Sequence, residues 1–364
     1  MGNVFLLGLT SLLTDISTEM VYPLLPLFLT ATLGASPAVV GLIEGIAESL
    51  ASLLKVFSGY LSDLWRRRKP MAIAGYASST AGKLLLYLAT SWWWVLAGRA
   101  IDRFGKGIRT APRDALIADS SPAAKRGRYF GLHRMLDTLG AAGGVLAAYF
   151  LLSAQPGSYR RIFLLSLLPA FLGVLILFFV REKAPTKEPS QAEAAEQKAA
   201  GPQAGPSVLR LRWSELNPRL RAFLLFTFLF TLGNSSNQFL LLRARHLGFA
   251  PAAVLLAYLL YNLVYALVSY PAGRLSDRVG RKHLLVAGYA TYGLVYLGFA
   301  LSSQSWQVWA LFALYGLYIG LTEGVEKALV ADVAPAELRA TLIGLHATLV
   351  GLGLFPASLL AGLL

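Results

Sequence analysis

The stretch that decides the fold is Gly273-Arg274-Leu275-Ser276-Asp277-Arg278-Val279-Gly280-Arg281-Lys282, which lies between two long apolar segments. A related stretch, Gly59-Tyr60-Leu61-Ser62-Asp63-Leu64-Trp65-Arg66-Arg67-Arg68-Lys69, stands 214 positions earlier in the same setting. Both copies carry an acidic residue near the middle and a basic cluster at the end. A short charged loop that recurs at half the length of an apolar chain indicates a duplicated bundle of membrane helices.

The composition is that of a protein embedded in a lipid bilayer. Hydrophobic residues make up 56% of the 364 positions and charged residues only 14%, with a mean hydropathy of +0.57. The net charge of +14 comes mainly from basic residues in alternate loops, which is the positive-inside pattern rather than a nucleic-acid-binding surface. We therefore predict a multi-pass protein of a bacterial-type plasma (inner) membrane, with its N-terminus in the cytoplasm and no nucleic-acid partner.

Eleven segments are long and apolar enough to cross the hydrocarbon layer. They lie at 4–33, 37–61, 71–91, 93–118, 128–153, 159–181, 219–241, 251–272, 283–303, 305–331 and 338–364. The polar stretch 182–217 separates the sixth from the seventh and is expected to be a flexible cytoplasmic linker. We predict a six-helix bundle at 1–181 and a second bundle at 218–364 with five visible spans, the twelfth being missing from the sequence.

The internal repeat extends well beyond the two loops. A series of residues before and inside the fifth span recurs 213 positions later. The first set is Ala118, Asp119, Pro122, Arg126, Gly131, Leu132 and His133, and the second is Ala331, Asp332, Pro335, Arg339, Gly344, Leu345 and His346. Asp15 and Glu19 likewise match Asn234 and Gln238 at a shift of 219. The two bundles are therefore predicted to be related by a pseudo-twofold axis.

The repeated loop resembles the signature of the major facilitator superfamily, Gly-x-Leu-Ala/Ser-Asp-Arg-x-Gly-Arg-Arg/Lys between its second and third spans. Residues 273–282 match it at every position, whereas the first copy departs from it at Leu64 and Arg66. The stretch 102–114 also resembles a group of uncharacterised bacterial facilitators. The resemblance covers nearly the whole chain. It implies an all-α polytopic membrane protein of two pseudo-symmetric six-span bundles that rock between two states.

The resemblance also implies a latch that holds the two halves together in the outward-facing state. Its expected members are Gly59, Asp63, Arg67 and Asp119 in the first half and Gly273, Asp277, Arg281 and Asp332 in the second. Each loop Asp is expected at the start of a span in the opposite half, the eleventh or the fifth, where the helix dipole favours an acid. Each loop Arg is expected to pair with the second Asp of its own half.

Charged side chains inside the spans predict a wet interior, since such groups are costly in lipid. The fourth span carries Arg99, Asp102, Arg103, Lys106, Arg109, Arg113 and Asp114 within an arc of about 140°. The predicted substrate cavity comprises Arg99, Asp102, Arg103, Lys106, Arg109, Asn234, Asn237, Gln238, Tyr258, Asn262, Tyr265 and Glu323. Arg113-Asp114 and Glu326-Lys327 occupy equivalent repeat positions with reversed signs, so we expect a charge match between the halves there.

Four carboxylates are candidates for proton coupling: Asp15, Glu19, Glu48 and Asp137. A carboxylate in a partly dry site has a raised pKa and can exchange protons near neutral pH. Of these residues, Glu19 or Asp137 is the favoured coupling group. Acidic and basic residues are equally numerous in the spans, so structural ion pairing is the competing interpretation for each of them.

These features predict a monomeric secondary transporter, coupled to protons, that moves a small anionic or zwitterionic solute without a cofactor or a bound metal. Within transport, the alternative is export of cationic drugs or divalent metal ions through Asp15, Glu19, Glu44 and Glu48. A non-transporting sensor or a membrane-embedded enzyme is a further alternative. The sequence contains no His-Glu-x-x-His, no Gly-x-Ser-x-Gly and no phosphate-binding loop, which disfavours an enzyme.

Overall fold

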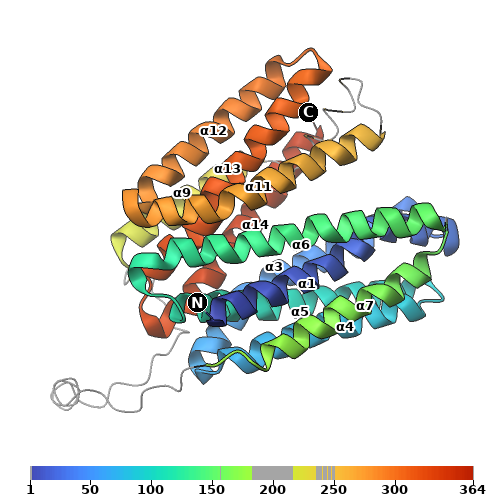
Figure 1. Ribbon diagram of the computed structural model, residues 1–364, viewed down its shortest axis with the longest axis horizontal. Helices are drawn as coiled ribbons and strands as arrows, with labels where there is room; N and C mark the ends of the chain where they lie inside the picture. Colours follow the sequence, from blue (N-terminus) through green and yellow to red (C-terminus); the bar gives the residue numbers. More distant parts are fainter. Residues whose placement is uncertain are drawn as a thin grey trace.

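The computed structural model describes residues 2–155, 157–182, 216–234, 240, 244, 247 and 251–363. Every regular element in these ranges is a helix (Figure 1), which confirms the all-α prediction. The long helices are α1 (Gly2–Val21), α3 (Pro37–Trp65), α4 (Arg68–Leu88), α5 (Trp92–Asp119), α6 (Arg126–Ala154), α7 (Tyr159–Leu177), α9 (Pro218–Leu232), α11 (Pro251–Val279), α12 (Arg281–Leu301), α13 (Ser305–Val333) and α14 (Arg339–Leu363). Short helical turns lie at Tyr22–Leu24, α2 (Leu25–Leu27), Phe28–Thr32, Ala123–Lys125 and Ala336–Leu338.

Each predicted span corresponds to one of the long helices, and the differences lie at the ends. α3 continues to Trp65, four residues past its apolar segment, and α13 to Val333, two residues past its own, because their charged ends fold as helix beyond the apolar core. The seventh predicted span, 219–241, corresponds to α9, and most of its last part lies outside the described residues. Residues 183–215 of the predicted linker lie outside them as well.

Five described helical segments are long and apolar enough to cross a membrane by length and composition alone. They are Gly2–Leu24, Ala123–Ala154, Tyr159–Leu177, Arg281–Leu301 and Ser305–Val333. α5 is not among them, because ionisable residues recur along its whole length. Its 28 residues rise by about 42 Å, which exceeds the hydrocarbon thickness of about 30 Å. α3 and α4 pack along α5 and bury much of its charged face.

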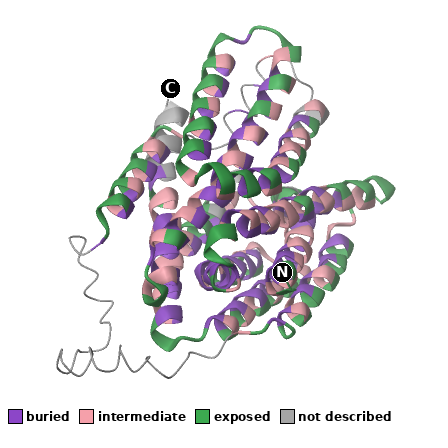
Figure 2. Cartoon of the chain, turned by 60° about the vertical axis from the view of Figure 1, so that its left-hand side comes forward, coloured by how far each residue is buried: buried purple, intermediate pink, exposed green. Residues whose placement is uncertain are grey.

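The helices form two groups that follow the order of the chain (Figure 1). α1 and α3–α7 make one group, and α9 with α11–α14 makes the other. The groups meet where α6 packs along α11 and α3 along α14, and they diverge from the end at which the chain begins (Figure 1). Figure 2 shows exposed residues on the outer faces and buried residues turned inward. This is the arrangement expected of helices whose outer faces contact lipid.

Four glycines allow the two groups to touch at backbone distance. A Cβ atom on Gly59 of α3 would collide with the carbonyl oxygen of Ala340 in α14, and one on Gly273 of α11 with that of Gly127 in α6. Gly131 and Gly344 make the corresponding contacts one turn away, against Ser269 and Lys55. All four are members of the internal repeat. The two crossings are therefore equivalent, and both require a residue without a side chain.

A hydrophobic cluster closes the end at which the two groups converge. It joins Leu7 and Ile117 of the first group to Ala328, Leu342 and Ile343 of the second, and each of these residues is fully or almost fully buried. We call this the latch end, because the α3–α4 and α11–α12 turns and the starts of α6 and α14 lie there.

Candidate functional site

The two loop aspartates cap helices of the opposite group at the latch end. Asp63 accepts hydrogen bonds from the backbone N–H groups of Ala340 (3.3 Å) and Thr341 (2.7 Å) at the start of α14. Asp277 accepts them from Gly127 (2.9 Å) and Arg128 (2.8 Å) at the start of α6. A carboxylate at this position satisfies free backbone donors and lies at the positive end of the helix dipole. Each cap therefore ties one half of the molecule to the other.

Arginines reinforce both caps. In the second half, Asp332 accepts hydrogen bonds from Arg281 Nε at 3.1 Å and from Arg126 of the first half at 2.9 Å. In the first half, Asp119 contacts both Arg68 and Arg339 of the second half. Each aspartate thus binds one arginine from each group, which doubles the number of charged links across the latch end.

The prediction that Arg67 pairs with Asp119 is wrong. Arg67 is exposed, and Arg68 donates to Asp119 instead. The cause is the length of the turn, since Arg66 and Arg67 separate α3 from α4 whereas Gly280 alone separates α11 from α12. The additional residue moves the basic partner one position along the chain.

A cavity of about 290 Å³ lies between the two groups, above the apolar cluster of the latch end. α1, α3, α5 and α6 line it from one side, and α13 and α14 from the other. Its walls are strongly ionised. The lining residues are Asp15, Lys55, Lys106, Arg109, Thr110, Arg113, Arg134, Asp137, Glu323, Glu326, Lys327, His346, Ala347 and Val350.

Two ion pairs cross between the groups at the wall of this cavity. Lys327 Nζ of α13 lies 2.7 Å from Asp114 Oδ2 of α5, and their side chains are 9% and 1% exposed. Arg134 of α6 contacts Glu323 of α13 and lies 2.8 Å from Asp137 on its own helix. Burial leaves these charges little water to replace a lost partner, so each pair strongly favours the present arrangement of the halves.

Asp114 and Lys327 are equivalent positions of the repeat, 213 residues apart. Two repeat-equivalent residues can touch one another only close to the axis that relates the repeats. Their ion pair therefore marks the position of the pseudo-twofold axis, at the floor of the cavity.

The residues next to this pair, Arg113 and Glu326, follow the symmetry of the repeat only in part. Arg113 binds Asp114 at 2.9 Å and lies 3.4 Å from the hydroxyl of Tyr76. Its equivalent, Glu326, accepts a hydrogen bond of 2.8 Å from Tyr289, the equivalent of Tyr76. In the described residues Arg113 forms no ion pair with Glu326. Of the four residues in the two dipeptides, Lys327 and Asp114 alone thus form the expected ion pair between the halves.

Two of the candidate coupling carboxylates meet in this cavity. Asp15 of α1 and Asp137 of α6 both line it. Asp137 is also bound to Arg134 of its own helix at 2.8 Å. A carboxyl group that contacts an arginine weakens that contact when it takes up a proton, because the bond then joins a charge to a neutral group.

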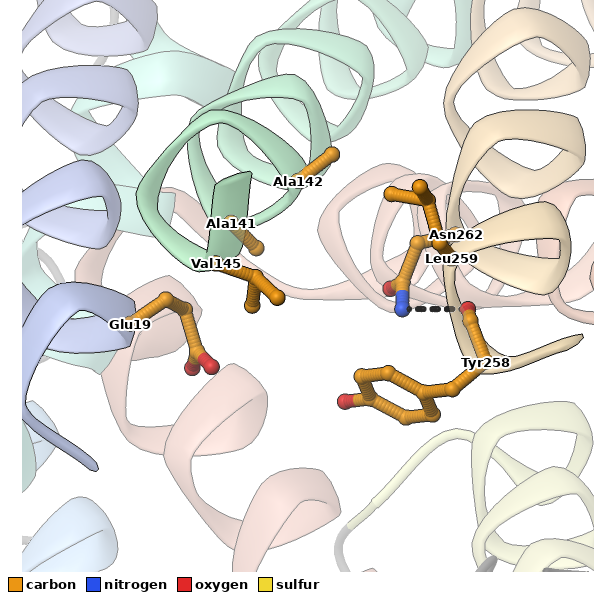
Figure 3. Close-up of a pocket in the computed structure, with 7 residues that line it drawn as sticks. All are labelled: Glu19, Ala141, Ala142, Val145, Tyr258, Leu259 and Asn262. Atoms are coloured by element: carbon orange, nitrogen blue, oxygen red, sulfur yellow. Dashed lines mark hydrogen bonds between the residues drawn. The ribbon is translucent and has the colours of Figure 1, made fainter. Parts of the chain in front are cut away.

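The other two candidate carboxylates lie elsewhere. Glu48 is half exposed and binds Arg103 at 3.1 Å. Glu19 lines a separate pocket of about 10 Å³ between α1, α6 and α11 (Figure 3), a volume that suits about one water molecule. In Figure 3 its carboxylate faces the hydroxyl of Tyr258 across this pocket, and Asn262 donates to the carbonyl of Tyr258 at 2.9 Å. The structure therefore separates Glu19 from the large cavity.

The predicted cavity residues divide into three groups. Lys106, Arg109 and Glu323 line the large cavity, and Tyr265 hydrogen-bonds to Glu323 at its edge. Tyr258 and Asn262 line the small pocket, and Asn234 lies 3.5 Å from the hydroxyl of Tyr296. Asn237 and Gln238 lie outside the described residues, as do the side-chain contacts of Glu44.

Arg99, Asp102 and Arg103 do not line the cavity of about 290 Å³. Arg99 lies 3.4 Å from Asp102, and both arginines stack on the ring of Tyr22. The charged face of α5 extends along the helix beyond the cavity. The turns that carry Arg99, Asp102 and Arg103 therefore face α3, α4 and the end of α1 instead.

Lys55 and His346 line the cavity, although neither was among the predicted site residues. In the sequence, Lys55 lies seven residues after Glu48 on the same helix face. His346 is the repeat partner of His133, which is buried and hydrogen-bonds to Ser11 at 2.9 Å. The sequence feature that could have identified Lys55 is its position one helical turn before Gly59, the glycine at the helix crossing.

The family model described as Major Facilitator Superfamily matches residues 7–242 and 223–364. A protein of Methanocaldococcus jannaschii, described as an uncharacterized MFS-type transporter, is 41% identical over 369 residues, which cover 100% of this chain and 88% of that protein. A human organic anion transporter has a similar fold, with a TM-score of 0.78, 18% identity and coverage of 98% and 92% of the two chains. A proton:xylose symporter gives a TM-score of 0.74 at 17% identity, with coverage of 98% and 86%. The resemblance of the repeated loop is confirmed: the chain belongs to the major facilitator superfamily of membrane transporters.

Proposed function

We propose that this chain is a proton-coupled secondary transporter that moves a small anionic or zwitterionic solute by alternating access. The two units that rock are residues 1–181 and 218–364, joined by the segment 182–217, and the latch end faces the cytoplasm of a bacterial-type inner membrane. The observation that carries the proposal is the ionised cavity at the interface of the halves, closed at one end by the two equivalent caps. Alternating access requires a site of this kind at the interface of the repeats.

Proton coupling is assigned to the Asp15–Asp137 pair. Both carboxyls line the cavity, Asp137 binds Arg134, and Arg134 also binds Glu323 of the other half. A proton taken up by Asp137 would neutralise it and weaken its bond to Arg134, because that bond then joins a charge to a neutral group. The protonation of one half is thereby linked to an ion pair that crosses to the other.

The excess of basic side chains in the cavity supports an anionic or zwitterionic cargo over a cationic one. Two of the carboxylates in the wall, Asp137 and Glu323, are already bound to Arg134. A cationic drug or a divalent metal would have to displace this arginine before it reached either of them.

Replacement of Asp137 by Asn is expected to abolish stimulation of transport by a pH gradient while solute exchange at equal pH continues. The amide keeps the shape of the side chain but cannot take up a proton. The measurement uses the purified protein in vesicles loaded with a pH-sensitive dye, to which small organic anions and amino acids are added in turn with and without an imposed gradient.

Glu19→Gln serves as the comparison in the same assay, because Glu19 lies in the separate pocket. Exposed Glu337 at the latch end supplies a matched control as Glu337→Gln, which should transport like the unmodified chain. Retention of the full pH response by Asp137→Asn, with its loss in Glu19→Gln, would transfer the coupling role to Glu19. Absence of any solute-dependent proton movement would overturn the proposed function.

A further inference from the structure

Two lysines face the cavity without an acidic partner. Lys55 of α3 and Lys106 of α5 both line it, and among the described residues neither forms an ion pair with a carboxylate. Glu48, the acid of α3 closest in sequence to Lys55 within the described side chains, is bound by Arg103 at 3.1 Å. An ammonium group that is partly removed from water is costly unless an anion compensates it. The cavity therefore contains two positive charges that lack their counterions.

Arg109 adds a third positive charge beside them. Its guanidinium hydrogen-bonds to Ser79 and stacks on the ring of Tyr76 at 4.5 Å from the centroid. Neither contact neutralises it, and both fix its orientation. A cation that is held in place before the ligand arrives loses little conformational entropy on binding.

His346 supplies an unused polar atom on the opposite wall. The residue is 4% exposed, its ring stacks on Phe223 at 5.6 Å, and its Nε2 has no hydrogen-bond partner in the described part of the chain. Glu326 Oε2 is 3.5 Å away, without the geometry of a hydrogen bond. A buried ring nitrogen at the edge of a cavity is available to a bound molecule.

The charges of the wall do not balance. Arg113 and Lys327 share Asp114, and Arg134 is matched by Asp137 and Glu323. The remaining cations are Lys55, Lys106 and Arg109, and the remaining acids are Asp15 and Glu326. Three basic groups thus face two acids, and neither lysine forms an ion pair with one of them among the described residues.

We propose that the cargo is a small organic dianion, held by Lys55, Lys106 and Arg109 with His346 on the opposite wall. A cavity of about 290 Å³ is many times larger than the roughly 10–15 Å³ that holds one water molecule, so it has room for a small organic solute. A dicarboxylate or a small phosphate ester has this size and charge. The inference rests on the proposed transport function and narrows its substrate class.

The test is binding of five probes to the purified full-length chain, measured by titration calorimetry. The probes are succinate, glycerol phosphate, acetate, glycine and tetraethylammonium. We expect succinate or glycerol phosphate to bind at least about tenfold more tightly than acetate, since one further charge-assisted contact contributes about 1.5–3 kcal/mol. Which dianion binds decides between a carboxylate and a phosphate group.

Lys55→Gln and Lys106→Gln are each expected to weaken binding of the preferred dianion by about tenfold or more, whereas Lys106→Arg, which keeps the charge, retains it. Lys125→Gln removes the same charge from an exposed position at the latch end and should leave binding unchanged. If the glutamine variants fail to fold, the ranking of probes on the unmodified chain still decides the matter.

Preference for glycine or tetraethylammonium over both dianions would overturn the inference, as would dianion binding that is unchanged in Lys55→Gln and Lys106→Gln. Failure of the proposed function looks different, because binding does not depend on transport. Dianion binding without pH-driven uptake would refute proton coupling and leave the assignment of the site intact. Proton-driven uptake of an amino acid, unaffected by the lysine substitutions, would refute the site and leave proton-coupled transport intact.

Discussion

Exchange of the dipeptides Arg113-Asp114 and Glu326-Lys327 between the two halves is expected to preserve transport, although reversal of either buried charge alone abolishes it. Lys327 and Asp114 are repeat equivalents that bind one another at 2.7 Å. Rotation about the pseudo-twofold axis places each of these residues where the other was. The exchanged chain therefore forms the same ion pair, with the lysine in the first half and the aspartate in the second. The flanking tyrosines, Tyr76 and Tyr289, are equivalent as well and can accept or donate to either partner.

The single variants leave buried charges without partners. Asp114→Lys places three cations together, and Asp114→Asn removes the acid that Arg113 and Lys327 share. Loss of one member of a buried pair costs about 3–5 kcal/mol, which is a large part of the stability of a domain. Melting temperature in detergent and solute-dependent proton flux in vesicles measure the two effects separately.

The full exchange carries Arg113→Glu, Asp114→Lys, Glu326→Arg and Lys327→Asp. A chain with only Asp114→Lys and Lys327→Asp is the matched comparison, because it re-forms the ion pair but sets a lysine beside Arg113. We expect its melting temperature to lie between that of the single reversal and that of the full exchange. A full exchange that is no more stable than Asp114→Lys would contradict the position of the axis.

Replacement of Arg134 by Met is the second change with a large expected effect. It leaves Asp137 and Glu323 without their shared cation, again at a cost of about 3–5 kcal/mol. Transport should be lost, because the link between Asp137 and Glu323 of the other half is gone. Melting temperature and pH-driven uptake are the measurements.

A triple variant separates the structural role of Arg134 from its role in coupling. Arg134→Met combined with Asp137→Asn and Glu323→Gln removes all three charges, so the melting temperature should recover while the response to a pH gradient stays absent. Arg161→Met is the matched control, since Arg161 is exposed and hydrogen-bonds to Gln155. Exposed substitutions of this kind change stability by about 0.5 kcal/mol or less. A pH response that returns in the triple variant would contradict the proposed link.

Hydropathy and the internal repeat predict most of the fold because both depend on local sequence. Span length follows from the thickness of the bilayer, and the 213-residue offset relates Asp114 to Lys327 before any coordinates are known. The 214-residue offset between the two loop copies identifies Gly59 and Gly273 as equivalent crossings. The internal repeat therefore predicts which distant residues correspond to one another, which the properties of a single residue cannot do.

The site is harder to predict because small changes in local geometry decide which charge meets which. One additional residue in the α3–α4 turn transfers the bond of Asp119 from Arg67 to Arg68. Seven charges share one face of α5, yet packing against α3 and α4 decides that Arg103 turns to Glu48 and Lys106 to the cavity. Sequence spacing gives the face of a helix but not the neighbour that covers it.

The central claim is that two repeat-related halves rock around an ionised cavity. The chain contains no cysteine, so pairs of spin labels can be placed without background. One pair, Lys125→Cys with Lys282→Cys, spans the halves at the latch end, and the other, Ala154→Cys with Ser303→Cys, spans them at the opposite end. Lowering the pH in the presence of the bound solute should lengthen the first distance and shorten the second. Two distances that stay fixed, or that change in the same direction, would contradict the account.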